Sequence, residues 1–223
     1  MNSRITQRTK ALFLCALLLL ALPAFSRSIP TINGDKAREA AREQVYWKGH
    51  ACTLSTLAQD FLQSIYGQTT YKGLSAVQVV YGWSLRPDVW KDEPMILIPD
   101  GDLRRQLSIA GEYAKFSELF DSAQTYRLNT IGADLPERMR QIVRESQPVI
   151  ELDEKVGMIV MLTQGRLIQP LPDSIPPLPA WRVEAEVLYN ATPLWVILLG
   201  AITLLGALVW ALTRPAGRAG LQA

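Results

Sequence analysis

The sequence predicts an α+β fold: a mainly helical periplasmic domain with a few short strands, followed by one C-terminal transmembrane helix. Three patterns predict it: apolar residues at helical spacing, short apolar runs bounded by turn residues, and a long uncharged apolar stretch near the C-terminus. The 223 residues are 48% hydrophobic and 20% charged, which suffices for one domain with a buried core. This composition excludes a disordered chain, a collagen-like fibre and a disulfide scaffold.

The net charge of +2 arises from the two ends of the chain. Arg4, Arg8 and Lys10 lie in the first ten residues, and Arg214 and Arg218 lie in the last ten, with no acidic residue in either. Without these five, 18 of the 23 basic residues stand against all 21 acidic ones, a net charge of −3. Basic residues beside apolar segments indicate membrane topology, whereas nucleic-acid binding needs a basic patch on the folded body. No nucleic-acid partner is expected.

Residues 1–26 are predicted to be a secretory signal peptide. A basic start precedes the apolar stretch 11–25, which a proline interrupts before small residues, and cleavage after Ser26 fits this pattern. An uncleaved N-terminal anchor is the alternative. Cys15 leaves with a cleaved peptide, so Cys52 has no intrachain disulfide partner in the mature domain.

The second apolar segment predicts a transmembrane helix over residues 191–213, followed by a cytoplasmic tail at 214–223. No charged residue occurs from 187 to 213, and the 20 residues 193–212 span about 30 Å as a helix, the thickness of the hydrocarbon core. Aromatic residues near its ends favour the membrane interface: Tyr189, Trp195 and Trp210. Basic residues then mark the cytoplasmic side of both apolar segments, so the region between them is expected in the periplasm, anchored to the inner membrane. A buried helix of a soluble protein is the alternative.

The exterior region begins with a predicted helix, strand and second helix. A capped helix over 34–44 precedes a brief strand at 45–47 and a Lys-Gly turn. Thr53 or Ser55 caps the next helix, and Gly67 ends it. Its apolar residues follow the i, i+3, i+4, i+7, i+8, i+11 pattern: Leu54, Leu57, Ala58, Phe61, Leu62 and Ile65.

Further helices and one strand are predicted along the rest of this region. Ser75 caps a helix, Pro87 begins a short helical turn, and the run 95–98 before Pro-Asp-Gly indicates a buried strand. Residues 103–123 are expected to be mostly helical. Two later helices are marked by Leu135, Met139, Ile142 and Val143, and by Leu152, Val156, Ile159 and Val160. A strand at 156–162 is the alternative for the second of these.

Residues 170–190 are predicted to be a proline-rich linker between the periplasmic domain, residues 27–169, and the membrane helix. Five prolines fall within the first ten of these residues. Such a density favours extended polyproline conformation and a stiff spacer.

Side chains suited to catalysis are scarce, so the chain is not expected to be an enzyme. The single histidine, His50, would have to serve any Ser-His-Asp or Cys-His site. His50 and Cys52 are two residues apart, which places them on the same face of a strand and suits a soft metal or haem iron. A surface histidine beside a buried cysteine is the alternative. No CXXCH motif occurs, so the chain is not itself a c-type cytochrome.

Three further patterns have two interpretations each. Trp47, Trp83 and Trp90 suit stacking on a porphyrin, or they belong to the core. The acidic run 151–154 suits a cation, or the solvated first turn of a helix. Small residues of the membrane helix recur at spacings of three and four and form a face that lets a second helix approach closely: Gly200, Thr203, Ala207 and Ala211. A single anchor without a partner helix is the alternative.

Several short motifs, in a common order, carry a resemblance to a known family. They are GHACTLSTLA (49–58), YKGLSAVQVVYGW (71–83), PDVW (87–90), PMILI (94–98), LFD (119–121), YRL (126–128), LDEKV (152–156), GRLI (165–168) and EVLYN (186–190). Together they resemble the periplasmic region of the fused system II cytochrome c biogenesis proteins, of the ResB–CcsA type, where this region precedes the multi-span CcsA part. The resemblance covers roughly residues 33–212 and implies a role in moving haem to the outside face and attaching it to apocytochrome c.

The chain departs from the family in ways that limit its role. His50 stands where the family usually has arginine, so it does not match the family's haem-ligand histidines, and Thr53 replaces a motif proline. The tryptophan-rich haem-handling loop and membrane histidines of the CcsA part have no counterpart here. The resemblance therefore predicts an accessory subunit or split half that binds a CcsA-like multi-span membrane protein and apocytochrome c.

Haem is expected to reach this chain only through such a complex, with His50 as the candidate haem contact. No resident cofactor or metal is expected. Two alternatives remain: a generic periplasmic adaptor of another inner-membrane complex, and a haem-binding protein that uses His50 with Cys52 or a methionine.

Overall fold

Helices α3 and α4 pack against each other in the core of the molecule. The computed structural model describes residues 29–192 and 194–213, so the predicted signal peptide and cytoplasmic tail lie outside the described residues. The helices are α2 (Gly34–Ala40), α3 (Leu54–Tyr66), α4 (Ala76–Leu85), α5 (Pro87–Trp90), α6 (Gly101–Gln106), η1 (Phe116–Leu119), η2 (Arg127–Thr130), α7 (Glu137–Arg144), α8 (Gln147–Thr163), α9 (Ala180–Ala191) and α10 (Leu194–Thr213). The strands are β1 (Gln44–Trp47), β2 (His50–Thr53), β3 (Thr70–Tyr71), β4 (Leu74–Ser75), β5 (Pro94–Leu97), β6 (Tyr113–Lys115) and β7 (Gln169–Pro170).

Helix α3 confirms the most regular helical pattern in the sequence. All six apolar residues predicted for its inner face are 0% exposed. The Thr53 hydroxyl accepts a hydrogen bond from the Thr56 amide, and Gly67 ends the helix in the left-handed region at φ +79°. Both ends therefore use the residues that the sequence indicated, because a hydroxyl satisfies a free amide and glycine adopts positive φ at little cost.

The strands form three small antiparallel sheets. Strands β2, β1 and β7 form one sheet in that order, β3 pairs with β4, and β5 pairs with β6. Strand β7 pairs with Val45 and Tyr46 of β1, which brings the segment after α8 back to the N-terminal hairpin. The fold is thus mainly helical with a few short strands, as predicted.

The prediction that residues 103–123 are mostly helical is wrong. Helix α6 ends at Gln106, and the chain then forms β6 and the short helix η1. Strand β6 pairs with β5 through Ile96 opposite Ala114 and Leu97 opposite Tyr113. This non-local pairing overrides the local helical preference. The alternative strand at 156–162 is also wrong, since these residues lie within α8.

Only the first half of the predicted linker is extended. Residues 180–190 belong to α9, which follows the last of the five linker prolines, Pro179, and packs against α3 and β2. Helix α9 buries Val183 at 8% exposure. The segment is therefore part of the folded body, because its apolar residues at helical spacing find a surface to cover.

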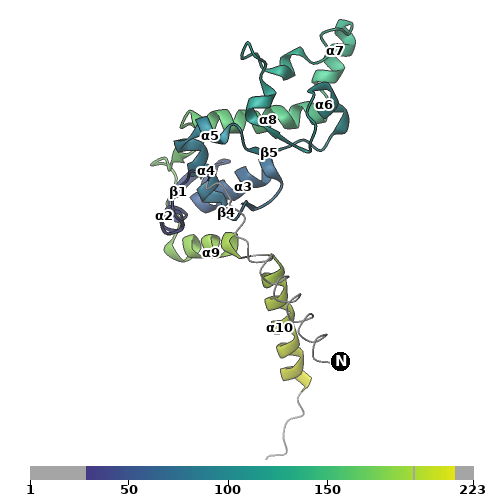
Figure 1. Ribbon diagram of the computed structural model, residues 1–223. Coiled ribbons are helices and arrows are strands. Elements are labelled where there is room, and N and C mark those ends of the chain that lie inside the picture. Colours follow the sequence, from purple (N-terminus) through teal and green to yellow (C-terminus); the bar gives the residue numbers. More distant parts are fainter. Residues whose placement is uncertain (1–28, 193, 214–223) are drawn as a thin grey trace, which may run out of the picture.

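Figure 1 shows the arrangement of the body and the two C-terminal helices. Helix α9 crosses the base of the body, α10 extends away from it on the side opposite the body, and α7 lies at the far end. Of the helices that the structure describes, none is by itself long and apolar enough to cross a membrane. Helix α9 and residues Val196–Trp210 satisfy the length and composition requirement only as a pair, bent by 109°.

Candidate functional site

The β1–β2 hairpin presents His50 at the surface. Trp47 pairs with His50 across the hairpin, so Lys48 and Gly49 form a two-residue loop. Both loop residues have positive φ, +48° and +88°, as a type I′ turn requires. The turn matches the right-handed twist of the strands and fixes the direction of His50.

The imidazole of His50 has one nitrogen engaged by its own hairpin. His50 Nδ1 lies 3.3 Å from the Lys48 carbonyl oxygen. Since a carbonyl only accepts, this hydrogen bond requires a proton on Nδ1 and leaves the lone pair on Nε2. Nε2 has no hydrogen-bond partner among residues 29–192 and 194–213. This tautomer leaves Nε2 able to bind iron or another soft metal.

An open hollow of about 430 Å³ lies beside His50. It is lined by the β1–β2 hairpin, the proline segment and the start of α9: Gly49, His50, Ala51, Ile175, Pro176, Pro177, Leu178, Pro179 and Arg182. The Gln44 amide holds the proline segment here, because its Nε2 donates to Leu178 O at 3.3 Å and its Oε1 accepts from Leu178 N at 2.6 Å. The proline segment gives the hollow an apolar side, and the hairpin and α9 contribute His50 and Arg182.

Cys52 does not join His50 in this hollow. Its side chain is 1% exposed in the core, whereas His50 is exposed at the turn. Burial, together with the negative charges of Glu186 and Asp60, raises the pKa of the Cys52 thiol to about 11. His50 and Cys52 therefore do not form a joint ligand set, because β2 leaves the core as it approaches the turn. The alternative interpretation, a surface histidine beside a buried cysteine, describes the geometry.

Two of the three candidate stacking tryptophans belong to the core. Trp83 and Trp90 are 1% and 0% exposed. Trp83 Nε1 lies 3.0 Å from Met95 Sδ, and Trp90 Nε1 donates to Pro30 O at 2.9 Å. Trp47 is half-buried and donates to Asp60 Oδ2 at 2.9 Å. These partners account for the indole groups without a porphyrin.

The acidic run 151–154 lies in the second turn of α8, one turn later than expected. Glu151, Asp153 and Glu154 are exposed, and Leu152 is buried. Across the residues that the structure describes, no group of three or more His, Cys, Asp or Glu side chains is arranged to hold a metal ion.

Helix α9 is bound to the body by a polar cluster that sequence reasoning missed. Glu186 Oε2 accepts from the Thr53 amide at 3.0 Å and from the Thr56 hydroxyl at 3.1 Å. Burial raises the pKa of the Glu186 carboxyl, but these hydrogen bonds and one from Arg182 outweigh burial and hold the pKa below its ordinary value. The Asn190 side-chain amide donates to the Thr56 hydroxyl at 3.1 Å, and the Asn190 backbone carbonyl oxygen accepts from the Gln59 side chain. The sequence feature that could have predicted this attachment is the pair Val183 and Val187, one helical turn apart, which marks an apolar face.

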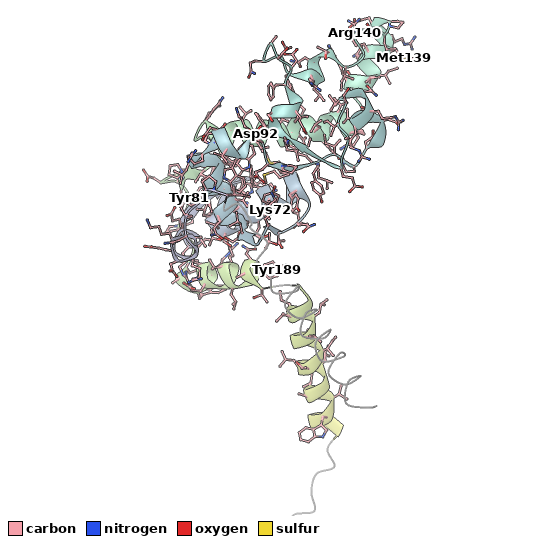
Figure 2. All side chains as sticks on the ribbon, viewed as in Figure 1. Lys72, Tyr81, Asp92, Met139, Arg140 and Tyr189 are labelled. Carbon is pink, nitrogen blue, oxygen red and sulfur yellow. The ribbon has the colours of Figure 1, made fainter. Side chains whose placement is uncertain are left out.

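The far end of the body carries an exposed apolar face. Leu135, Met139 and Ile142 are 38%, 54% and 60% exposed on and before α7. Arg140 fixes the preceding turn, since its guanidinium donates to the carbonyl oxygens of Gly132, Ala133 and Leu135. Figure 2 shows Met139 and Arg140 at the end of the molecule opposite α10. We call Leu135, Met139 and Ile142 the distal apolar face.

The predicted small-residue face lies on α10. Gly200 has open space where a Cβ would be, and the Thr203 hydroxyl donates to the carbonyl oxygens of Leu199 and Gly200. Ala207 is exposed, and Ala211 lies in the last turn of α10. The Thr203 hydroxyl is satisfied within the helix, so this face presents small groups without an unpaired donor.

The chain is similar to protein NrfI of Wolinella succinogenes. The two are 27% identical over 156 residues, which cover 63% of this chain and 17% of NrfI. The chain therefore matches only a small part of that relative. No family model matches the chain.

Proposed function

We propose that this protein is a membrane-anchored accessory subunit, or split half, of a cytochrome c biogenesis complex. The observation that carries the proposal is the similarity to NrfI over 156 residues, together with the resemblance of the chain's motifs to system II cytochrome c biogenesis proteins. The order of short motifs along residues 33–212 supports the same conclusion. The subunit acts by binding and positioning its partners, and no bond-making step is assigned to its own side chains.

Two surfaces suit two different partners. The small-residue face of α10 suits a helix of a multi-span, CcsA-like membrane protein, because small side chains let two backbones approach closely. The distal apolar face of α7 lies at the opposite end of the molecule and suits a water-soluble partner, apocytochrome c. The body would then hold the haem acceptor at a fixed distance from the membrane partner.

Loss of covalent haem is the direct test. Deleting the coding sequence in its host should abolish covalent haem staining of c-type cytochromes, and a plasmid copy should restore it. Normal staining in the deletion strain would overturn the proposal. Purification of the intact chain with its membrane helix distinguishes the alternative: a CcsA-like partner supports this function, whereas an unrelated transporter supports a generic periplasmic adaptor.

The distal apolar face has its own test. Ile142→Asp should lower covalent haem staining while leaving the amount of protein in the membrane unchanged, because the side chain is 60% exposed and supports no core contact. Ser122→Asp, at an exposed loop position, is the control. Equal staining in the two variants would exclude the face as a partner contact.

A transient haem contact at His50 is a second candidate function. His50 would hold haem iron through Nε2, and the prolines of the hollow would contact the porphyrin. Haem is cargo in this scheme and passes through the complex. Haem added to the purified chain should give a Soret band that shifts in His50→Ala and is unchanged in Lys48→Ala. A Soret band identical in His50→Ala and wild type would remove this role.

A further inference from the structure

Helix α9 has an inner face that the body covers and an outer face that is exposed. Val183, Glu186, Val187 and Asn190 point to the body, where Val183 is buried and Glu186 and Asn190 bind Thr53 and Thr56. The opposite face carries exposed side chains at helical spacing: Trp181, Ala185, Leu188 and Tyr189. Trp181, Leu188 and Tyr189 are 72%, 68% and 62% exposed. We call these four residues the outer face of α9.

The charged residues of α9 leave the outer face uncharged. Glu184 accepts from Arg42 of the body at 2.7 and 3.1 Å, and Glu186 accepts from Arg182 and from the body. Each charged group is therefore paired at the flank or inner side of the helix. Between these flanks lie an indole, an alanine methyl, a leucine and a phenol. Tryptophan and tyrosine together with an aliphatic residue are typical of the membrane–water interface.

The position of α9 along the chain limits its distance from α10. Only Thr192 and Pro193 separate the two helices. The three Cα–Cα steps from Ala191 to Leu194 span at most about 11 Å when extended. If α10 occupies the bilayer, the C-terminal end of α9 therefore lies at the bilayer surface. Figure 2 shows Tyr189 at this end of α9, next to the start of α10.

The angle between the helices fixes how α9 meets that surface. Helices α9 and α10 are bent by 109° relative to each other. A helix nearly perpendicular to a membrane span lies nearly parallel to the membrane plane. Figure 1 shows the body on one side of α9 and α10 on the other, so the outer face of α9 is turned to the side of α10.

We propose that α9 is an interfacial helix that lies flat on the outer surface of the bilayer, with Trp181, Leu188 and Tyr189 in the headgroup–acyl boundary. A lipid surface fits better than a protein partner because the face is uncharged, carries two interfacial aromatic residues and continues directly into α10. The proposal rests on the membrane attachment in the proposed function. In this arrangement α9 is a fixed mount and not part of a proline-rich spacer, because its inner face is bonded to α3 and β2.

A fixed mount has a consequence for the two partner surfaces. Since α9 is bonded to the body on one side and held by lipid on the other, the body keeps one orientation over the membrane. The hollow beside His50 adjoins the start of α9 through Arg182, so it lies close to the lipid surface. The distal apolar face lies at the far end, away from it.

Nitroxide labels at three positions test this arrangement in the full chain. Each label is placed in a background with Cys15→Ser and Cys52→Ala, and the protein is reconstituted in phosphatidylethanolamine–phosphatidylglycerol vesicles. Leu188→Cys samples the outer face of α9, and Leu204→Cys, at 74% exposure, samples the middle of α10. Leu85→Cys is the matched control, because it is an exposed leucine at 58% in the body, at the C-terminal end of α4. Accessibility to oxygen and to a water-soluble nickel complex gives the depth of each label.

The expected result is a graded series. The oxygen-to-nickel accessibility ratio at Leu188 should be several-fold above that at Leu85 and below that at Leu204. A ratio at Leu188 equal to that at Leu85, with a high ratio at Leu204, would overturn the interfacial helix and leave the membrane anchor intact. Low accessibility to both oxygen and the nickel complex at Leu188 would also overturn the interfacial helix. That result would mean that a second copy of the chain covers the outer face of α9. A water-like ratio at Leu204 would overturn the membrane attachment itself.

Discussion

The tryptophans of two regions have opposite environments. In the α3–α4 core, Trp83 and Trp90 are 1% and 0% exposed, and each indole nitrogen has a partner. On α9, Trp181 is 72% exposed. Tryptophan therefore stabilises the fold in the α3–α4 core, whereas on α9 it forms part of an exposed apolar surface. The core therefore fixes the fold, whereas α9 provides a surface that needs something outside the body.

The largest expected difference comes from truncating the two kinds of tryptophan. Trp90→Ala should lower the free energy of unfolding by about 3–5 kcal/mol, because it removes a fully buried ring and leaves a cavity. Trp181→Ala should change it by less than about 0.5 kcal/mol. Denaturant unfolding of the full chain in detergent, followed by near-ultraviolet circular dichroism, measures both. Equal losses in the two variants would contradict the division into core and surface.

Two glycines on neighbouring helices differ in the space around them. A Cβ at Gly82 of α4 would overlap the indole of Trp90, whereas a Cβ at Gly157 of α8 would meet nothing within 4 Å. Gly82→Ala should therefore destabilise by about 1–3 kcal/mol through overpacking. Gly157→Ala should stabilise by about 0.5–1 kcal/mol, because alanine loses less entropy in a helix. The same unfolding measurement gives both signs, and a stabilising Gly82→Ala would show that the core relaxes freely.

The hydrogen bonds of Glu186 determine how firmly α9 is held. Glu186→Gln should cost about 1–2 kcal/mol at pH 7, since it weakens charge-assisted bonds to Thr53 and Thr56. The pKa of Glu186 lies below its ordinary value in the folded chain, so its contribution is complete above about pH 4.3 and is lost as the pH falls through the lowered pKa. The stability difference between wild type and Glu186→Gln should therefore shrink on acidification.

Glu184→Gln, two residues away, is the matched control for this prediction. Its partner Arg42 and the Glu184 carboxylate are both largely exposed, so solvent screens the pair and the effect should be smaller. Hydrogen exchange of the α9 amides, measured in parallel, should accelerate in Glu186→Gln and remain near wild type in Glu184→Gln. Unchanged exchange in both variants would mean that apolar packing alone holds α9.

The sequence predicted the parts of the fold that depend on local patterns. The apolar period of α3, the hydroxyl cap at Thr53 and the glycine at Gly67 each act within a few residues, so they were visible without the structure. Strand β6 was missed because its pairing with β5 is non-local. The position of α9 was missed because the five prolines dominated the interpretation of 170–190. The candidate site follows the same rule: the sequence marks His50, and only the fold brings residues 175–179 and Arg182 beside it.

The smallest expected signal is the reaction of Cys52 with a thiol reagent. With a pKa of about 11 and 1% exposure, Cys52 carries roughly a hundredfold less thiolate at pH 8 than a free cysteine and is shielded from solvent. In a Cys15→Ser background, Ellman's reagent should leave Cys52 almost unreacted until the chain is unfolded, whereas Ser122→Cys should react at once. Rapid labelling of Cys52 would show that β2 opens and would restore the pair of His50 and Cys52 as a joint ligand set. Slow labelling leaves the haem contact to His50 alone, so the His50→Ala spectrum decides it without interference from the thiol.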